Sequence, residues 1–235
     1  SAPMSDKIHA AVAKLPEQPV KCLNNTHWHG DHTGGTENFG KAGAIIVAHD
    51  NVRKRMNTEQ FMEAFGRTVE ASPPIALPIV TFSDTTTLYW NDEEIRVIHV
   101  DPAHTDGDSI IYFTKANVLH TGDCFFNGMY PFIDPSSGGS IDGMIAASER
   151  ILELVNDETK IIPGHGPAGS AEDVREFRNM LQTARDNIQK LIDVGKTKDE
   201  TIAAKPTAEL DAKWGNGYFK PDMWVGIVYL GMKKD

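Results

Sequence analysis

Residues 26–35 of the chain read THWHGDHTGG, and this stretch holds three histidines and an aspartate: His27, His29, Asp31 and His32. The whole chain of 235 residues has only nine histidines, so three of them within six residues far exceed an even spread. Imidazole nitrogens and carboxylate oxygens are ligands for zinc and similar divalent ions. Two histidines two positions apart on an extended segment present their rings to the same side, and a turn at Gly30 can redirect the next side chains. The stretch therefore predicts a metal site.

Three further candidate ligands follow short apolar runs that we interpret as strands. His104 follows residues 95–100, Asp123 follows residues 118–120, and His165 follows residues 160–162. Because α/β proteins build their sites just past the carboxyl ends of strands, we expect these segments to converge with residues 27–32 on one rim. Glycines flank the same positions, among them Gly122 and Gly164, and allow the close backbone approach that a crowded cluster needs.

The remaining hydrophobic pattern predicts a single α/β domain. Further strands are expected at residues 20–23, 44–48 and 109–113, and helices at residues 7–15, 141–155, 171–194 and 222–232. Ser170 is the expected N-cap of the longest helix. Residues 72–78 (SPPIALP) are interpreted as a loop between two structured halves. Strands mixed with helices indicate a layered fold.

Composition excludes several classes of protein. The chain is 40% hydrophobic and 24% charged, as expected of a globular domain with a real core, and no apolar run is long enough for a transmembrane helix. The 23 basic against 33 acidic residues give a net charge of −10, which disfavours nucleic acid as a partner. The two cysteines, Cys22 and Cys124, are too few for a disulfide scaffold and too far apart for a CxxC motif.

Four motifs together resemble those of the metallo-β-lactamase-fold hydrolases. They are residues 26–35, residues 102–109 (PAHTDGDS), residues 121–123 (TGD) and residues 163–166 (PGHG), and their order and spacing match as well. The resemblance implies an αββα sandwich, in which two mixed β-sheets pack face to face and helices cover the outer faces.

The resemblance also implies a ligand set for two metal ions. One ion would be held by His27, His29 and His104, the second by Asp31, His32 and His165, and Asp123 would bridge them. The aspartate at position 123 departs from the antibiotic-hydrolysing subclass, which has cysteine there, and is similar to the glyoxalase II and lactonase branches. Because successive residues of an extended segment point to opposite sides, we expect Asp123 and not Cys124 to face the metals.

The activity implied is that of a dinuclear zinc hydrolase, in which a metal-bound hydroxide opens a small amide, ester, lactone or thioester. Asp31 would be the catalytic residue, both ligating a metal and orienting the nucleophile. Two alternatives stay open: the same ligands could hold a single iron or mixed metals and perform oxygen chemistry on a persulfide, or the chain could be a non-catalytic metal-binding module. The compartment also stays open between bacterial periplasm and cytoplasm, because relatives of this kind are often exported.

Two further expectations concern the substrate pocket and the N-terminus. Residues 125–132 (FFNGMYPF) follow Asp123, and we expect their aromatic side chains to border the pocket, with core packing as the alternative: Phe125, Phe126, Tyr130 and Phe132. Only 26 residues precede His27, whereas the family's metal motif follows a first sheet of several strands. We therefore expect an N-terminal segment supplied separately, or a partner subunit such as a second copy, to complete the sheet; the alternative is a shortened variant that uses the residues after Thr197.

Overall fold

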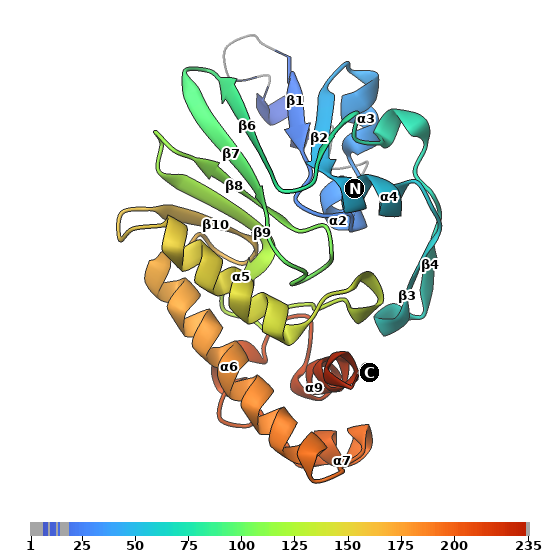
Figure 1. The fold of residues 1–235 in the computed structure, drawn as a ribbon, viewed down its shortest axis with the longest axis vertical. Coiled ribbons are helices and arrows are strands. Elements are labelled where there is room, and N and C mark those ends of the chain that lie inside the picture. Colours follow the sequence, from blue (N-terminus) through green and yellow to red (C-terminus); the bar gives the residue numbers. More distant parts are fainter. Residues whose placement is uncertain (1–6, 9, 13, 15–18, 234–235) are drawn as a thin grey trace.

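Two stacked β-sheets with helices on their outer faces make up the computed structural model, which describes residues 7–8, 10–12, 14 and 19–233 (Figure 1). The smaller sheet has three parallel strands in the order β1-β2-β5: β1 (Cys22–Asn24), β2 (Ile45–His49) and β5 (Val80–Phe82). The larger sheet has the order β10-β9-β8-β7-β6: β6 (Thr85–Trp90), β7 (Glu93–His99), β8 (Ser109–Phe113), β9 (Val118–Phe126) and β10 (Lys160–His165). Only its β9 and β10 pair in parallel.

Alternation along the strands of the larger sheet divides the core into layers. Val97 and Ile111 are register partners and face the smaller sheet, where they form a buried cluster with Val47 and Phe82. The neighbouring partners Ile98 and Ile110 face the other way and belong to the main core beneath the helices. Each face of the larger sheet is therefore covered by apolar side chains, as a two-sheet sandwich requires.

The outer face of the larger sheet is covered by α5 (Ile141–Leu154) and α6 (Ala171–Asp193), and α9 (Pro221–Met232) packs against these two helices. Ser170 and Asp173 form a capping box at the start of α6, which confirms the predicted N-cap. Short helices α7 (Lys198–Ala203) and α8 (Asp211–Trp214) connect α6 to α9. The smaller sheet carries α3 (Thr36–Lys41) and α4 (Asp50–Met56), and Val52 and Met56 of α4 pack on Trp28, Ala48 and Leu77. Among the described residues, no helix is long and apolar enough to cross a membrane.

A β-hairpin that the sequence pattern did not predict stands apart from both sheets, near the C-terminal helix in Figure 1. It consists of β3 (Gln60–Met62), the 3₁₀ turn η1 (Glu63–Phe65) and β4 (Arg67–Val69). Gly66 adopts φ 56° between η1 and β4, a left-handed conformation that favours glycine.

The other expected elements lie within a few residues of their predicted bounds. The main difference is β9, which continues through Asp123 to Phe126 instead of ending at residue 120. The loop expected over residues 72–78 contains one 3₁₀ turn, η2 (Pro74–Ala76). The helix expected over residues 7–15 falls partly outside the described residues, of which 7, 8 and 10–12 are helical. No feature of the fold tests the expected N-terminal segment, so it stays a prediction.

Candidate metal centre

Every predicted ligand lies at the same end of the two sheets. The segment after β1 carries His27 and His29. At Gly30, where a turn was expected, the short helix α2 (Gly30–Thr33) begins, and it carries Asp31 and His32. From the larger sheet come His104 in the loop between β7 and β8, Asp123 inside β9 and His165 at the end of β10. Four distant sequence segments thus bring seven side chains together.

His27, His29 and His104 form a buried triad whose ligand atoms lie within 4.8 Å of one another. Nδ1 of His29 lies 2.7 Å from Nε2 of His104. The other ring nitrogens of these two histidines face oxygen acceptors: His104 Nδ1 donates to the Phe132 carbonyl at 2.8 Å, and His29 Nε2 donates to Asp134 Oδ2 at 3.0 Å. If these two nitrogens carry the ring protons, the two facing nitrogens present lone pairs to each other, which is an arrangement suited to a shared metal ion.

His27, the third histidine of this triad, also has a ring nitrogen available for a metal ion. Nε2 of His27 is buried and has no hydrogen-bond partner among the described residues, whereas its Nδ1 lies 3.1 Å from Thr26 Oγ1. Burial, followed by neighbouring groups that include His104, holds the pKa of His27 well below its ordinary value, so the ring is neutral. A neutral imidazole with a buried, unused lone pair is a metal-ligand geometry.

Asp31, His32 and His165 form a second, more open triad. Asp31 Oδ2 lies 3.3 Å from His32 Nε2 and 3.2 Å from His165 Nε2. The side chains of Asp31 and His165 are 56% and 39% exposed, so this triad faces solvent while the first one is enclosed. Hydrogen bonds that His165 donates to Asp123 and Asp31 raise the pKa of His165 to about 10. Burial opposes protonation of His32, but the same two carboxylates outweigh it and raise its pKa to about 9.

Asp123 lies between the two triads. One of its oxygens is 3.0 Å from His32 Nε2, and the other is 3.4 Å from His165 Nε2 and 3.5 Å from His104 Nε2. The neighbouring Cys124 points into the hydrophobic core, as alternation along β9 requires. A Cβ at Gly164 would lie only 2.0 Å from Asp123 Oδ1, so β10 leaves room for the carboxylate only because this residue is glycine.

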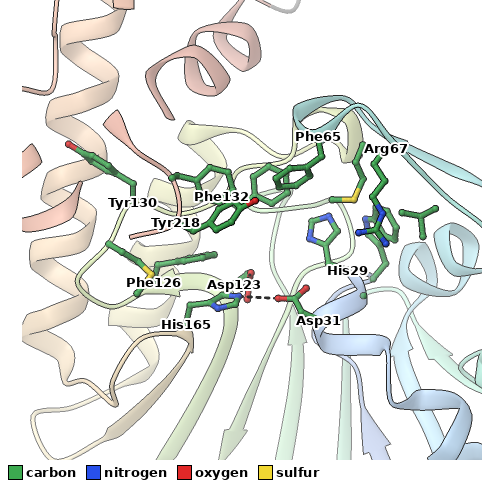
Figure 2. A pocket seen from close by; sticks show the side chains of 16 residues that line it. His29, Asp31, Phe65, Arg67, Asp123, Phe126, Tyr130, Phe132, His165 and Tyr218 are labelled. Atoms are coloured by element: carbon green, nitrogen blue, oxygen red, sulfur yellow. Dashed lines mark ion pairs between the residues drawn. The ribbon is translucent and has the colours of Figure 1, made fainter. Parts of the chain in front are cut away.

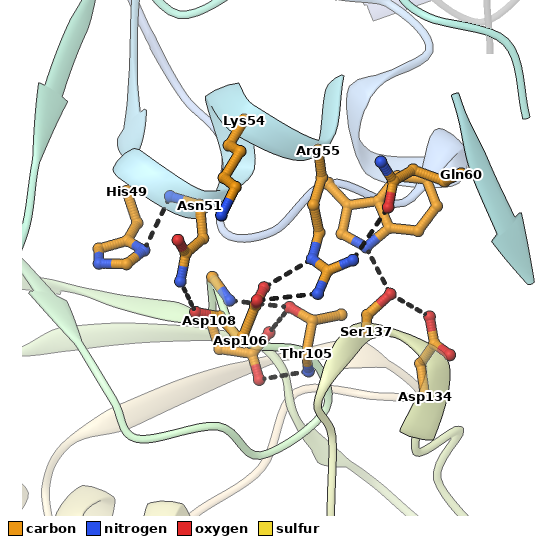
Figure 3. Close-up of polar contacts among 12 residues, drawn as sticks. His49, Asn51, Lys54, Arg55, Gln60, Thr105, Asp106, Asp108, Asp134 and Ser137 are labelled. Atoms are coloured by element: carbon orange, nitrogen blue, oxygen red, sulfur yellow. Dashed lines mark hydrogen bonds and ion pairs between the residues drawn. The ribbon is translucent and has the colours of Figure 1, made fainter. Parts of the chain in front are cut away.

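A layer of polar contacts holds the first triad in place, and Figure 3 shows part of it. Asp134, which bonds His29, also accepts hydrogen bonds from Ser136 and Ser137. Asp108 accepts hydrogen bonds from the backbone N–H groups of His104 and Thr105. Sequence reasoning missed Asp134, because the aspartate is 105 residues from its histidine and belongs to no motif.

A cavity of about 760 Å³ opens above the cluster, within the usual range for small-molecule sites (Figure 2). Phe126, Tyr130 and Phe132 line it, together with Tyr218 and Phe219 from the C-terminal loop. Phe125, which was expected there as well, is not among the lining residues. It is buried in the main core, where its ring packs on that of Phe177 with centroids 5.3 Å apart.

Aromatic contacts join the cavity wall to the cluster. The ring of Phe132 stacks on Phe219 at 5.1 Å and lies 5.5 Å from the ring of His29. On the other side, Phe126 stacks on His165 at 4.9 Å. The apolar wall thus reaches the edge of both triads.

Comparison with known proteins agrees with this geometry. The sequence model described as "Metallo-beta-lactamase superfamily" matches residues 2–172. A hydroxyacylglutathione hydrolase of Nitrosococcus oceani is 28% identical over 166 residues, which are 69% of this chain and 55% of that protein. An acyl-coenzyme A thioesterase of Gallus gallus is 23% identical over 153 residues, 60% of this chain and 54% of that protein.

The chain thus spans a little more than half the length of these two curated relatives. Among solved structures, a metallo-beta-lactamase from Pontibacter korlensis superposes with a TM-score of 0.60 at 20% identity, covering 75% of this chain and 76% of that one. This similarity concerns the fold alone, and it confirms the predicted two-sheet sandwich. With a family match over most of its length and the expected fold, the chain belongs to the metallo-beta-lactamase superfamily.

Proposed function

We propose that the chain is a metal-dependent hydrolase that holds two divalent ions, with zinc as the proposed metal, and cleaves a small acyl substrate. His27, His29 and His104 would hold one ion, Asp31, His32 and His165 the other, and Asp123 would serve both. The observation that carries this proposal is the pair of facing nitrogens, His29 Nδ1 and His104 Nε2, at 2.7 Å. Their partner nitrogens are already engaged with Asp134 and Phe132, which leaves the two facing nitrogens available as metal ligands.

The donor set fits zinc. Three imidazoles alone, or imidazoles with carboxylates, are its usual ligands in catalytic sites, and such ions lower the pKa of a bound water to about 7 and so supply hydroxide at neutral pH. The same donors also accept iron, which is why metal content is decisive for the alternative oxygen chemistry.

The protein's own residues would position the reactants. Asp31 is the most exposed of the seven side chains and lines the cavity, where its carboxylate can orient an attacking water and accept its proton. The aromatic side chains that line the cavity would exclude bulk water from the acyl group: Phe126, Tyr130, Phe132, Tyr218 and Phe219. Asp134 would fix the His29 ring, so that its Nδ1 stays directed into the cluster.

Thioesters are the first substrates to test among amides, esters, lactones and thioesters. Two relatives described above carry names of thioester-cleaving enzymes, a hydroxyacylglutathione hydrolase and an acyl-coenzyme A thioesterase. The bridging position also has aspartate here, which the sequence resemblance connects with the glyoxalase II and lactonase branches.

The test is a screen of thioester, lactone, β-lactam and phosphodiester substrates with zinc-loaded protein, repeated with Asp123→Ala. We expect hydrolysis of an acyl substrate by the wild type and a loss of at least about a hundredfold in the variant, because both triads lose their shared carboxylate. Asp157→Ala removes an exposed carboxylate remote from the cavity and serves as the control. Activity on the phosphodiester alone, or an Asp123→Ala rate close to wild type, would contradict the proposal.

A further inference from the structure

Arg67 differs from every other arginine of the chain. The sequence has eight arginines, all in the described part, and seven of them bond or pair with another residue: Arg53, Arg55, Arg96, Arg150, Arg175, Arg178 and Arg185. For Arg67, the described residues provide neither a hydrogen bond nor an ion pair. Arg67 is an exposed residue, and it also lines the cavity above the cluster.

Strand register directs Arg67 toward the cavity. In the β3–β4 hairpin Arg67 is the partner of Met62, and directly opposed residues of an antiparallel pair lie on the same face. Met62 and Val69, two residues along β4, both line the cavity with Arg67. Phe61 lies on the opposite face of the hairpin and is 57% exposed. Figure 2 shows Arg67 and Phe65 descending from the hairpin beside the cavity.

Contacts at both ends hold the hairpin in this position. At its base, Arg55 donates to the Gln60 side chain at 2.9 Å and forms a two-pronged ion pair with Asp106 (Figure 3). At its tip, the ring of Phe65 lies 5.1 Å from that of Phe132 and 6.2 Å from that of Phe219. The guanidinium is therefore carried by an anchored element.

Arg67 is the only lysine or arginine among the described residues that line the cavity, and the surrounding wall is mostly apolar. A guanidinium in such a wall favours a planar anion that accepts two parallel hydrogen bonds, such as a carboxylate. One guanidinium, in a chain whose net charge is −10, suits one negative charge better than a chain of phosphates.

We propose that Arg67 is a specificity determinant that selects acyl substrates carrying one carboxylate beside an apolar body. The inference rests on the proposed hydrolase function. In the bound substrate, the apolar body would lie along the aromatic wall, the scissile bond at the cluster and the carboxylate at Arg67.

The activity test compares two thioesters that differ only in charge: the phenylacetyl thioester of thioglycolate and that of thioglycolamide. We expect zinc-loaded wild type to prefer the acid by about tenfold in kcat/KM, mainly through KM, as expected for a charge-assisted hydrogen bond. In Arg67→Met the preference for the acid should vanish, because cleavage of the acid should fall more than cleavage of the amide. Arg150→Met, which makes the same charge change on the outer helix α5, should retain the preference. Equal cleavage of both thioesters by wild type, or a parallel loss of both in Arg67→Met, would overturn the inference.

A binding test separates the inference from the proposed function. Hydrocinnamate and hydrocinnamamide are titrated calorimetrically into metal-free wild type, Arg67→Met and Arg150→Met. We expect the carboxylate to bind more tightly to wild type and Arg150→Met, and Arg67→Met to lose most of that preference. If no thioester is hydrolysed but this pattern holds, the proposed function fails and the anion site stands. If Arg67→Met keeps the full preference, the anion site is wrong whatever the activity.

Discussion

Asp134 shows how one residue outside the motifs can fix the chemistry of a motif residue. It accepts from His29 Nε2 at 3.0 Å and is itself held by hydrogen bonds from Ser136 and Ser137. Hydrogen bonding to His29, once the opposing cost of burial is overcome, holds the pKa of Asp134 well below its ordinary value, so the residue is a carboxylate. Its charge and geometry select the His29 tautomer whose Nδ1 is free for a metal.

Replacing that carboxylate should weaken metal binding without unfolding the chain. For Asp134→Asn we expect zinc affinity to fall by about ten- to a hundredfold, the usual effect of losing an outer partner of a ligand histidine. The asparagine can still cap the turn at Ser136. Competition with a chromophoric chelator measures the affinity, and circular dichroism checks the fold. Unchanged zinc affinity would show that Asp134 does not position His29.

A second residue-scale prediction concerns His49, which lies away from the cluster. Its ring stacks on His99 with centroids 3.7 Å apart, and its Nε2 faces the Ser83 carbonyl. Burial and then the nearby His99 lower its pKa, although the Ser83 carbonyl and the more distant Asp50 and Asp106 oppose the shift. The unfolded chain therefore binds more protons than the folded one just below the ordinary histidine pKa of about 6.5.

Because the folded-state pKa of His49 is lowered, His49 contributes to the free energy of unfolding in full above about pH 6.5. This contribution is lost as the pH falls toward the folded-state pKa. His49→Asn removes the titration and leaves a side chain that can cap α4. We expect the variant's urea midpoint to fall less than the wild-type midpoint between pH 8 and pH 5.5, both measured without metal. Parallel decreases would rule out this contribution of His49.

At the scale of elements, the long patterns were predictable and the short ones were not. Helix α6 runs over Ala171–Asp193, within one residue of the expected end, because its apolar stripe continues for many turns and its capping box marks the start. Strands β3 and β4 have three residues each, too few for alternation to be recognised. Their hairpin is stabilised by contacts with Arg55, Phe132 and Phe219, which the alternation of the two strands does not reveal.

The pairing of β9 with β10 yields a prediction about Gly164. A Cβ there would lie 2.0 Å from Asp123 Oδ1 and 2.8 Å from the Gly122 backbone. In Gly164→Ala the strands or the carboxylate must move, so we expect loss of at least one bound metal ion per chain with little change in secondary structure. Gly231→Ala in α9 adds the same methyl group where the nearest atom is 3.5 Å away, and should bind metal normally. Full metal content in Gly164→Ala would show that the close approach does not constrain Asp123.

At the scale of the whole molecule, the sequence predicted which segments meet but not the space between them. The seven motif residues do converge at one end of the two sheets, six of them in segments that follow strands or at the end of β10, and Asp123 inside β9. The cavity above them depends on the hairpin and on Phe219 of the C-terminal loop, neither of which carries a motif. Arg67 is the arginine of this cavity, and its place there could be predicted only once the register of β3 and β4 was known.

The cluster joins segments that follow strands of both sheets, so metal binding and the stability of the whole fold are linked. The central claim is that this cluster holds two divalent ions through seven side chains. Elemental analysis of the full chain, purified, loaded with zinc and freed of excess metal, tests it most directly. We predict close to two zinc ions per chain in the wild type and no more than one in Asp123→Ala. A wild type that retains a single ion, or none, would contradict the account.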